Sequence, residues 1–169
     1  MEEEYIVDSQ LGPVRITYNS NGITRIKFTK DAVEISPKSK AVNKNLEIAI
    51  KWLETYFENA HETKSMDYPC LDMEAHSGKK FMCTVWKVLK DQVGPGDTIS
   101  YGELAKLSGS PNAARAVGQA MKNNPFSIIV PCHRVINASG EMGNYSGGVD
   151  KKHWLLRHEG KDFDLKDKN

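Results

Sequence analysis

The chain has 169 residues, of which 39% are hydrophobic and 27% are charged. These values are ordinary for a globular protein and exclude wholesale disorder, while the length suits one domain or two small ones. No apolar stretch approaches the ~18 residues that a membrane-spanning helix needs, so we expect no segment that crosses a membrane.

The formal net charge is only +1, but the charges are unevenly distributed. Residues 1–75 carry nine Lys or Arg against thirteen Asp or Glu, whereas residues 76–161 carry twelve against six. A nucleic-acid-binding surface would make the second half basic, although chance can produce the same asymmetry.

The cysteines and the N-terminus favour a reducing compartment. Cys70, Cys83 and Cys132 are an odd number, which argues against a closed disulfide framework. The chain begins with Met1 and three glutamates, the reverse of the basic start of a signal peptide. We therefore expect a cytoplasmic protein with free thiols.

The first half predicts a small sheet and one helix. Residues 4–9, 13–19 and 22–30 alternate or carry β-branched residues, which predicts three short strands. Asn21-Gly22 predicts a tight hairpin turn, because both residues tolerate positive φ. Apolar residues at spacings of three and four predict a helix over 42–58. They are Val42, Leu46, Ile50, Leu53 and Phe57.

The stretch 61–76 is polar and shows no periodicity, which predicts a linker. We therefore divide the chain into an N-terminal αβ domain over residues 1–76 and a C-terminal domain over residues 77–169.

The second half predicts helices. Apolar residues recur every four positions from Phe81 to Val93, and Gly94-Pro95-Gly96 then ends this helix. Ser100, three residues before Glu103, predicts a capping box for a short helix over 101–107. Further helices are expected over 112–122 and 150–158. The turn at 108–111 joins the helices expected over 101–107 and 112–122. Two short helices joined in this way are typical of a DNA-binding helix-turn-helix and also of an ordinary helical hairpin.

Cys132 has the neighbours that a reactive cysteine needs. It follows the apolar run 128–130 and Pro131, and it directly precedes His133 and Arg134. A thiolate is the nucleophile, and nearby positive charge or a base lowers the pKa of a thiol. Cys70 and Cys83 have no such neighbours, so we interpret both as structural or incidental.

His133 is the candidate general base for Cys132, and a carboxylate is expected to hold its other ring nitrogen. Glu159, Glu141 and Asp150 are all candidates, and spacing does not choose among them. A zinc site made from Cys132, His133, His153 and His158 lacks a C-x-x-C pair, so we expect no metal and no cofactor.

The segment 131–135 resembles the PCHRV signature of the methylated-DNA–protein-cysteine methyltransferases. The resemblance continues in order through residues 99–105, 115–121, Asn124-Pro125, 143–148 and 154–160, and it covers about residues 78–160. Residues 1–75 match weakly. This ordered set of motifs is far more specific than a lone PCHR.

The resemblance implies an α/β (α+β) fold. A ribonuclease-H-like small sheet plus helix would form the N-terminal domain, and a mostly helical domain with a helix-turn-helix would bind DNA and transfer the alkyl group. The implied reaction is stoichiometric, irreversible DNA repair. Cys132 would take a methyl or alkyl group from the 6-oxygen of guanine, and less well from the 4-oxygen of thymine, in double-stranded DNA. The protein would be a monomer without an obligate protein partner.

The resemblance also assigns roles to residues. His133 would activate Cys132 through a water molecule, Glu159 would hold the imidazole, Asn124 would tie the recognition helix to the active-site segment, and Tyr101 would help protonate the leaving guanine. Arg115 would fill the gap left by the flipped nucleotide. The other residues expected to contact the base or the DNA are Ala114, Gly118, Met121, Arg134, Val135, Tyr145 and Ser146.

Two family variants are not expected. One carries zinc in its N-terminal domain, but residues 1–60 contain neither Cys nor His. The other replaces the acceptor cysteine with tryptophan, whereas Cys132 is present. A non-catalytic module that recognises alkylated DNA remains the alternative, and a Cys–His–Glu hydrolase would require turnover and an oxyanion hole.

Overall fold

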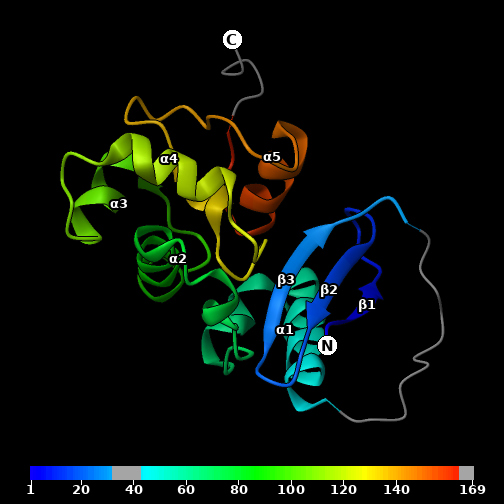
Figure 1. Ribbon diagram of the computed structural model, residues 1–169. Helices are drawn as coiled ribbons and strands as arrows, with labels where there is room; N and C mark the ends of the chain where they lie inside the picture. The colour runs from blue at the N-terminus through cyan, green and yellow to red at the C-terminus, as the bar shows by residue number, and fades with distance from the viewer. Residues whose placement is uncertain (32–42, 164–169) are drawn as a thin grey trace. The chain divides into compact units, whose positions relative to one another are not determined.

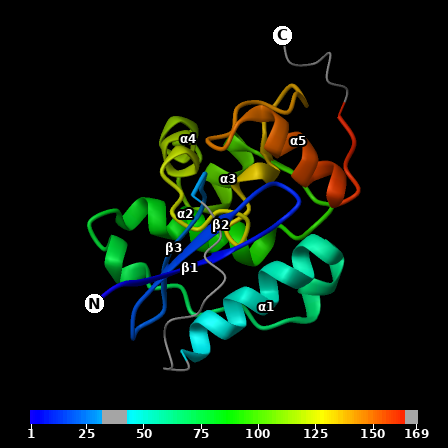
Figure 2. The same cartoon turned by 90° about the vertical axis from the view of Figure 1, so that its right-hand side faces the viewer.

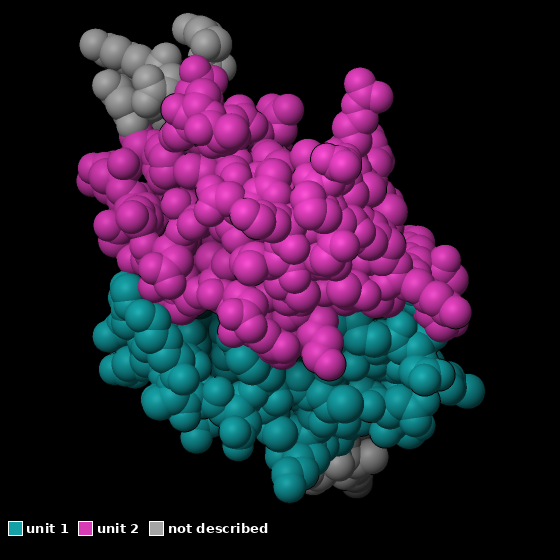
Figure 3. All heavy atoms as spheres, turned by 90° about the vertical axis from the view of Figure 1, so that its left-hand side faces the viewer, with its two compact units in different colours: residues 1–76, 125–127 teal, residues 77–124, 128–169 magenta. Residues whose placement is uncertain are grey.

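The computed structural model describes residues 1–31 and 43–163. The chain forms two compact units (Figure 3): Met1–His76 with Pro125–Ser127, and Ser77–Asn124 with Ile128–Asn169. The first contains a small antiparallel sheet and the second is mostly helical, so the predicted α/β class is confirmed. In the described parts of the chain, no helix is long and apolar enough to span a bilayer.

The three predicted strands form an antiparallel meander in the order β1-β2-β3 (Figure 1). Their bounds are β1 Glu3–Val7, β2 Val14–Tyr18 and β3 Ile23–Phe28. Alternate side chains of β2 and β3, among them Ile16 and Ile26, are fully buried, because one face of the sheet packs against a helix.

The hairpin between β2 and β3 forms, but not by the predicted backbone geometry. The side-chain oxygen of Asn19 accepts hydrogen bonds from the backbone N–H groups of Asn21 (2.8 Å) and Gly22 (3.1 Å). Asn21 does not adopt positive φ, so that part of the prediction is wrong. Gly22 has φ 152°, and a Cβ there would lie 2.5 Å from the carbonyl oxygen of Cys70. Close approach of the backbone therefore requires this glycine.

Helix α1 (Lys44–Glu58) packs on the sheet (Figures 1 and 2). The side chain of Asn43 caps it by accepting from the N–H of Leu46 at 3.1 Å. Val42, predicted to begin this helix, lies outside the described residues. The buried face differs partly from the predicted stripe, since it is centred on aromatic side chains; its members are Ala49, Trp52, Leu53, Tyr56 and Phe57.

The predicted linker over 61–76 is wrong, because this segment is part of the first unit. It contains the short 3-10 helices η1 (Ala60–Ser65) and η2 (Met73–His76). The stretch between these two helices bonds to β3 through its backbone. The N–H of Ile23 donates to the carbonyl of Cys70 at 2.8 Å, and the N–H of Asp72 donates to the carbonyl of Ile23 at 2.7 Å. The segment thus pairs with β3, and polar composition alone did not reveal that pairing.

Pro125–Ser127 completes the same sheet from a distant part of the sequence. The N–H of Ile26 donates to the carbonyl of Pro125 at 2.7 Å, and the N–H of Ser127 donates to the carbonyl of Ile26 at 3.0 Å. The next residue, Ile128, is fully buried and has φ 72°. A β-branched residue in the left-handed region is strained, so the surrounding contacts must hold this bend in place.

The second unit contains α2 (Lys80–Gln92), α3 (Tyr101–Leu107), α4 (Ala114–Lys122) and α5 (Val149–His158). The helices α2, α3 and α4 pack against one another, and α3 and α4 form the predicted helix-turn-helix. Ser100 caps α3, because its hydroxyl accepts from the N–H of Glu103 at 3.1 Å. The indole N–H of Trp86 donates to the carbonyl of Ala120 at 2.8 Å and fixes α2 to α4.

A short parallel pairing of β4 (Ile99–Ser100) with β5 (Val135–Ile136) connects the start of α3 to the segment after Cys132. Cys132 itself begins the 3-10 turn η3 (Cys132–Arg134). Local chain geometry therefore places the predicted nucleophile beside the first residue of the helix-turn-helix.

Candidate active site

Cys132 is enclosed but not inaccessible. Its exposed fraction is 5%, and it lines a cavity of about 950 Å³ in the second unit. The buried run 128–130 leads into η3 and fixes the backbone from which the thiol projects. Neither Cys70 nor Cys83 lines this cavity, which agrees with their interpretation as incidental.

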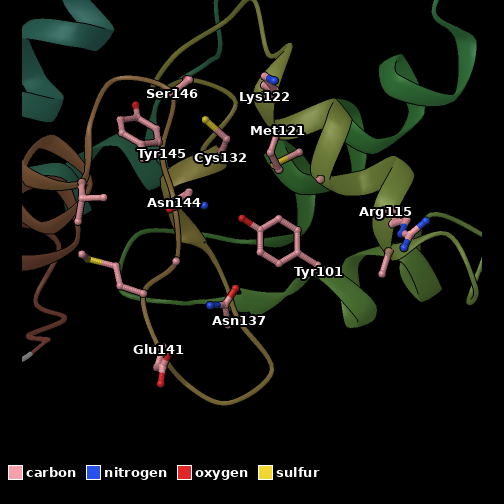
Figure 4. A pocket seen from close by; sticks show the side chains of 15 residues that line it. Tyr101, Arg115, Met121, Lys122, Cys132, Asn137, Glu141, Asn144, Tyr145 and Ser146 are labelled. Atoms are coloured by element: carbon pink, nitrogen blue, oxygen red, sulfur yellow. The ribbon is translucent and has the colours of Figure 1, made fainter. Parts of the chain in front are cut away.

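Most residues predicted to meet the base or the DNA surround this cavity (Figure 4). They come from α3, α4 and the irregular loop before α5, and they include both aromatic and small side chains. The predicted residues among its lining are Tyr101, Ala114, Arg115, Gly118, Met121, Cys132, Tyr145 and Ser146.

Helix α4 offers a surface that a duplex can approach closely. Ala114, Arg115 and the neighbouring Gln119 are exposed, and a Cβ added at Gly118 would meet nothing within 4 Å. Small side chains at this face leave room for a nucleic-acid backbone, while Arg115 offers a planar group that can donate hydrogen bonds and stack.

His133, which directly follows Cys132, forms a buried pair with Glu159. Nε2 of His133 lies 2.7 Å from Oε2 of Glu159, and both side chains have an exposed fraction of 0%. The structure thereby selects Glu159 among the three carboxylates considered, since Glu141 and Asp150 are exposed. Glu159 follows α5 as its C-cap residue, which brings together two side chains 26 positions apart.

The charges of this pair follow from its surroundings. Burial would raise the pKa of Glu159, but His133 and Arg134 hold that pKa far below its usual range. Burial lowers the pKa of His133, Arg134 and Lys152 lower it further, and Glu159 opposes them. At neutral pH the imidazole is therefore neutral, with its proton on the Nε2 that faces the carboxylate and its lone pair on Nδ1.

Two tyrosines lie close to the Cys132 sulfur. Burial raises the pKa of Tyr101, and the charge that Cys132 carries as a thiolate adds to this effect. Burial, the same charge and a hydrogen bond to Cys132 raise the pKa of Tyr145. Both phenols therefore keep their protons at neutral pH and can donate them to nearby acceptors.

Asn124 directly follows Asn123, the C-cap residue of α4. Its side-chain N–H donates to the carbonyl of Val130 at 2.9 Å, and both residues are buried. This bond joins the end of α4 to the run that precedes Cys132.

Arg134 is a correction to the predicted site. We expected it to contact DNA, but its exposed fraction is 3% and its guanidinium bonds Glu159 and the carbonyl of Val93. It is directed away from the cavity because the buried carboxylate is its ion-pair partner. Local sequence could not show this, since Glu159 lies 25 positions away.

Val135 does not line the cavity, and both of its backbone groups have partners within the protein. Its N–H donates to the carbonyl of Cys132, and its carbonyl accepts from Nζ of Lys152 at 2.7 Å.

Lys152 is a site residue that the sequence reasoning missed. It is fully buried, and its Nζ also donates to the carbonyl of Asn144 at 2.9 Å, in the loop that lines the cavity. Burial lowers its pKa to about 8. Its helical spacing from Leu155, Leu156 and Glu159 was an available signal, because it places a lysine on the buried face of α5.

Across the described residues, no three His, Cys, Asp or Glu side chains are grouped so that they could hold a metal ion.

Two family models match the chain. The model described as 6-O-methylguanine DNA methyltransferase, DNA binding domain, matches residues 80–161, and the ribonuclease-like domain of the same protein matches residues 3–66. Residues 3–66 lie within the first compact unit, and residues 80–161 lie within the second apart from 125–127. The two matches confirm the predicted resemblance.

Individual proteins agree with the family models. The methylated-DNA–protein-cysteine methyltransferase of Homo sapiens is 42% identical over 91% of this chain and 78% of its own length. The protein of that name from Methanosarcina acetivorans is 41% identical over 92% of this chain and 96% of its own length. The crystal structure of Mycobacterium tuberculosis OGT in complex with DNA superposes with a TM-score of 0.73 at 36% identity, covering 93% of this chain and 92% of that one.

A reactive-cysteine motif at a cavity, a helix-turn-helix beside it and relatives matched over nearly the whole chain lead to one conclusion. The chain belongs to the methylated-DNA–protein-cysteine methyltransferase family and is a DNA-binding repair enzyme that transfers an alkyl group to cysteine.

Proposed function

We propose that Cys132 is the acceptor cysteine and that its substrate is guanine alkylated at the 6-oxygen in double-stranded DNA. The observation that carries this proposal is the position of the Cys132 thiol, which lines the cavity while its sequence neighbour His133 bonds Glu159 at 2.7 Å. The 4-oxygen of alkylated thymine would be a poorer substrate of the same site.

The reaction balances without any cofactor. His133 accepts the thiol proton on Nδ1, directly or through a water molecule, and the thiolate attacks the alkyl carbon in line with the bond to the 6-oxygen. That bond breaks as the carbon–sulfur bond forms, and guanine leaves as an anion. Tyr101 donates a proton to the leaving base, and the proton held by His133 restores the phenol.

The attack requires that the base leave the helical stack, because a duplex shields the alkyl carbon from an in-line approach. Helix α4 supports this step, since Ala114 and Gly118 permit close approach and Arg115 can fill the vacated space. Tyr145, Met121 and Ser146 would then contact the extruded base within the cavity.

The thioether that forms has no easy route back to the thiol, so each chain reacts once. We infer that the protein works as a monomer without an obligate protein partner. A free thiol that must survive until it meets damaged DNA also suits a reducing compartment such as the cytoplasm.

Intact mass before and after incubation with a duplex that carries one 6-O-methylguanine tests the proposal. We expect a gain of one methylene that saturates at one per chain and maps to Cys132. Cys132→Ala should abolish the gain, whereas Cys83→Ala, which alters a half-buried thiol outside the cavity, should retain it. Binding of the duplex without any gain in mass would instead identify a non-catalytic recognition module.

A further inference from the structure

Arg134 is a buried cation that the proposed reaction leaves without a task. Its Nε donates to Oε1 of Glu159 at 2.7 Å, and its Nη2 donates to Oε2 at 3.1 Å. Its Nη1 donates to the carbonyl of Val93, the C-cap residue of α2, at 2.6 Å. The guanidinium therefore joins the end of one helix to the carboxylate that faces the imidazole.

These contacts leave Glu159 little freedom. Oε1 of Glu159 accepts from Arg134, and Oε2 accepts from both Arg134 and His133. With both oxygens held, the carboxylate cannot rotate, so the direction of its bond to Nε2 of His133 is fixed. A planar guanidinium fits this two-point geometry, whereas an ammonium offers a single point charge.

We propose that Arg134 is a positioning residue for alkyl transfer, which acts through Glu159 to orient His133 and to set the charge around it. The proposal rests on the proposed function, in which His133 takes the thiol proton.

The positive charge of Arg134 also affects the protonation of His133. The charged groups that act on His133 are Arg134 on η3, Lys152 on α5 and Glu159 at the end of α5, whereas the charge of a Cys132 thiolate acts on Tyr101 and Tyr145. Glu159 raises the pKa of His133, and Arg134 lowers it. Arg134 therefore offsets the carboxylate, so that the imidazole is oriented by Glu159 and yet stays neutral and able to accept a proton.

A double-mutant cycle tests the proposal: wild type, Arg134→Met, Glu159→Gln and the combined variant. The readout is the single-turnover rate of Cys132 benzylation by the free base 6-O-benzylguanine, followed by intact mass across pH. The free base removes any contribution from DNA binding. We expect Arg134→Met to slow the wild type by about tenfold or more but to slow Glu159→Gln by less than about twofold, because both changes break the same network.

The pH profile separates positioning from a general loss of structure. In Arg134→Met the rise of the rate at acid pH should move to higher pH, because His133 loses a neighbouring cation and holds its proton more tightly. Arg134→Lys retains the charge but not the two-point contact, so its acid limb should stay near that of wild type while its plateau falls. Ring resonances of isotope-labelled His133 provide a direct check on the same shift.

Two results would overturn the proposal: equal slowing by Arg134→Met in both backgrounds, or an acid limb that does not move. If Arg134→Met alone fails to fold, Arg134→Lys in the wild-type and Glu159→Gln backgrounds gives the comparison, because it keeps the buried charge and loses only the two-point contact: its plateau should fall in the wild-type background and stay unchanged in Glu159→Gln. Failure of the proposed function would look different, since wild type itself would then gain no benzyl group.

Discussion

The side-chain amide of Asn124 donates a 2.9 Å hydrogen bond to the carbonyl of Val130, and thereby connects the last turn of α4 to the segment that carries Cys132. Both groups are buried, so the bond is protected from competition with water. This buried polar contact thus joins the helix proposed to contact DNA to the segment that carries the thiol.

Removal of this contact should lower both stability and the rate of repair. We expect Asn124→Ala to lower the free energy of unfolding by about 0.5–1.5 kcal/mol, because it removes one buried hydrogen bond while the carbonyl of Val130 still accepts from the N–H of Cys132. Urea denaturation measures this change, and the mass assay gives the rate. The matched control is Asn123→Ala, whose side chain is exposed and bonds only the carbonyl of Gln119 in its own helix; a loss of equal size there would contradict the prediction.

Arg115→Ala should separate repair in duplex DNA from the chemistry at sulfur. Arg115 is exposed on α4 and lines the cavity, whereas the proposed activation of Cys132 uses His133 and Glu159. We expect the variant to react with free 6-O-benzylguanine at nearly the wild-type rate and to repair a methylated duplex at least about tenfold more slowly, as expected for loss of an inserted side chain. Arg157→Ala, an exposed arginine outside the cavity, is the control. Equal losses on both substrates would show that Arg115 acts on the site itself.

The ion pairs of Glu159 should make the fold sensitive to acid. Since its pKa in the folded state lies below the unfolded value of about 4.3, this group stabilises the fold above that pH, and the contribution is lost as pH falls. Glu159→Gln should therefore be less stable than wild type at pH 7 by about 3–5 kcal/mol, because Arg134 loses its charged partner. The difference between the two unfolding curves should shrink toward pH 2. Glu141→Gln, which alters an exposed carboxylate, should show no such trend.

Lys152 should also make stability rise with pH, but in the alkaline range. Its pKa of about 8 lies below the unfolded value of about 10.4, so the unfolded chain binds more protons between these values. Wild type should consequently gain stability relative to Lys152→Met as pH rises from 8 to 10.4, by up to about 3 kcal/mol. Chemical denaturation of both proteins across this range measures the difference. A constant difference would mean that the lysine keeps an ordinary pKa when buried.

Sequence patterns predicted those features that depend on neighbouring residues. The strands, the capping of α3 by Ser100 and the helix-turn-helix all follow from short-range periodicity and capping chemistry. The presence of His133 and Arg134 beside Cys132 likewise predicts that Cys132 is the reactive thiol, which the mass assay tests.

Features that depend on tertiary contacts could not be predicted in this way. The choice of Glu159 as the partner of His133, and the burial of Arg134 against it, join residues 26 and 25 positions apart. The segment 61–76 is polar and shows no periodicity. It pairs with β3 through backbone groups, which leave no pattern of side chains in the sequence. Asn21 was assigned positive φ from its type, whereas the side chain of Asn19 forms the turn without it.

The contribution of Pro125–Ser127 to the first sheet has a consequence for how the chain is synthesised. The ribosome releases residues 1–76 long before residue 125, so the N–H and carbonyl of Ile26 emerge without their eventual partners. Domains generally fold as units during synthesis, and an unpaired strand edge is prone to aggregate. Here the N-terminal unit can be completed only after α4 has been translated. A nascent chain arrested before residue 125 should therefore expose β3 to proteases and chaperones, and one arrested after residue 127 should protect it.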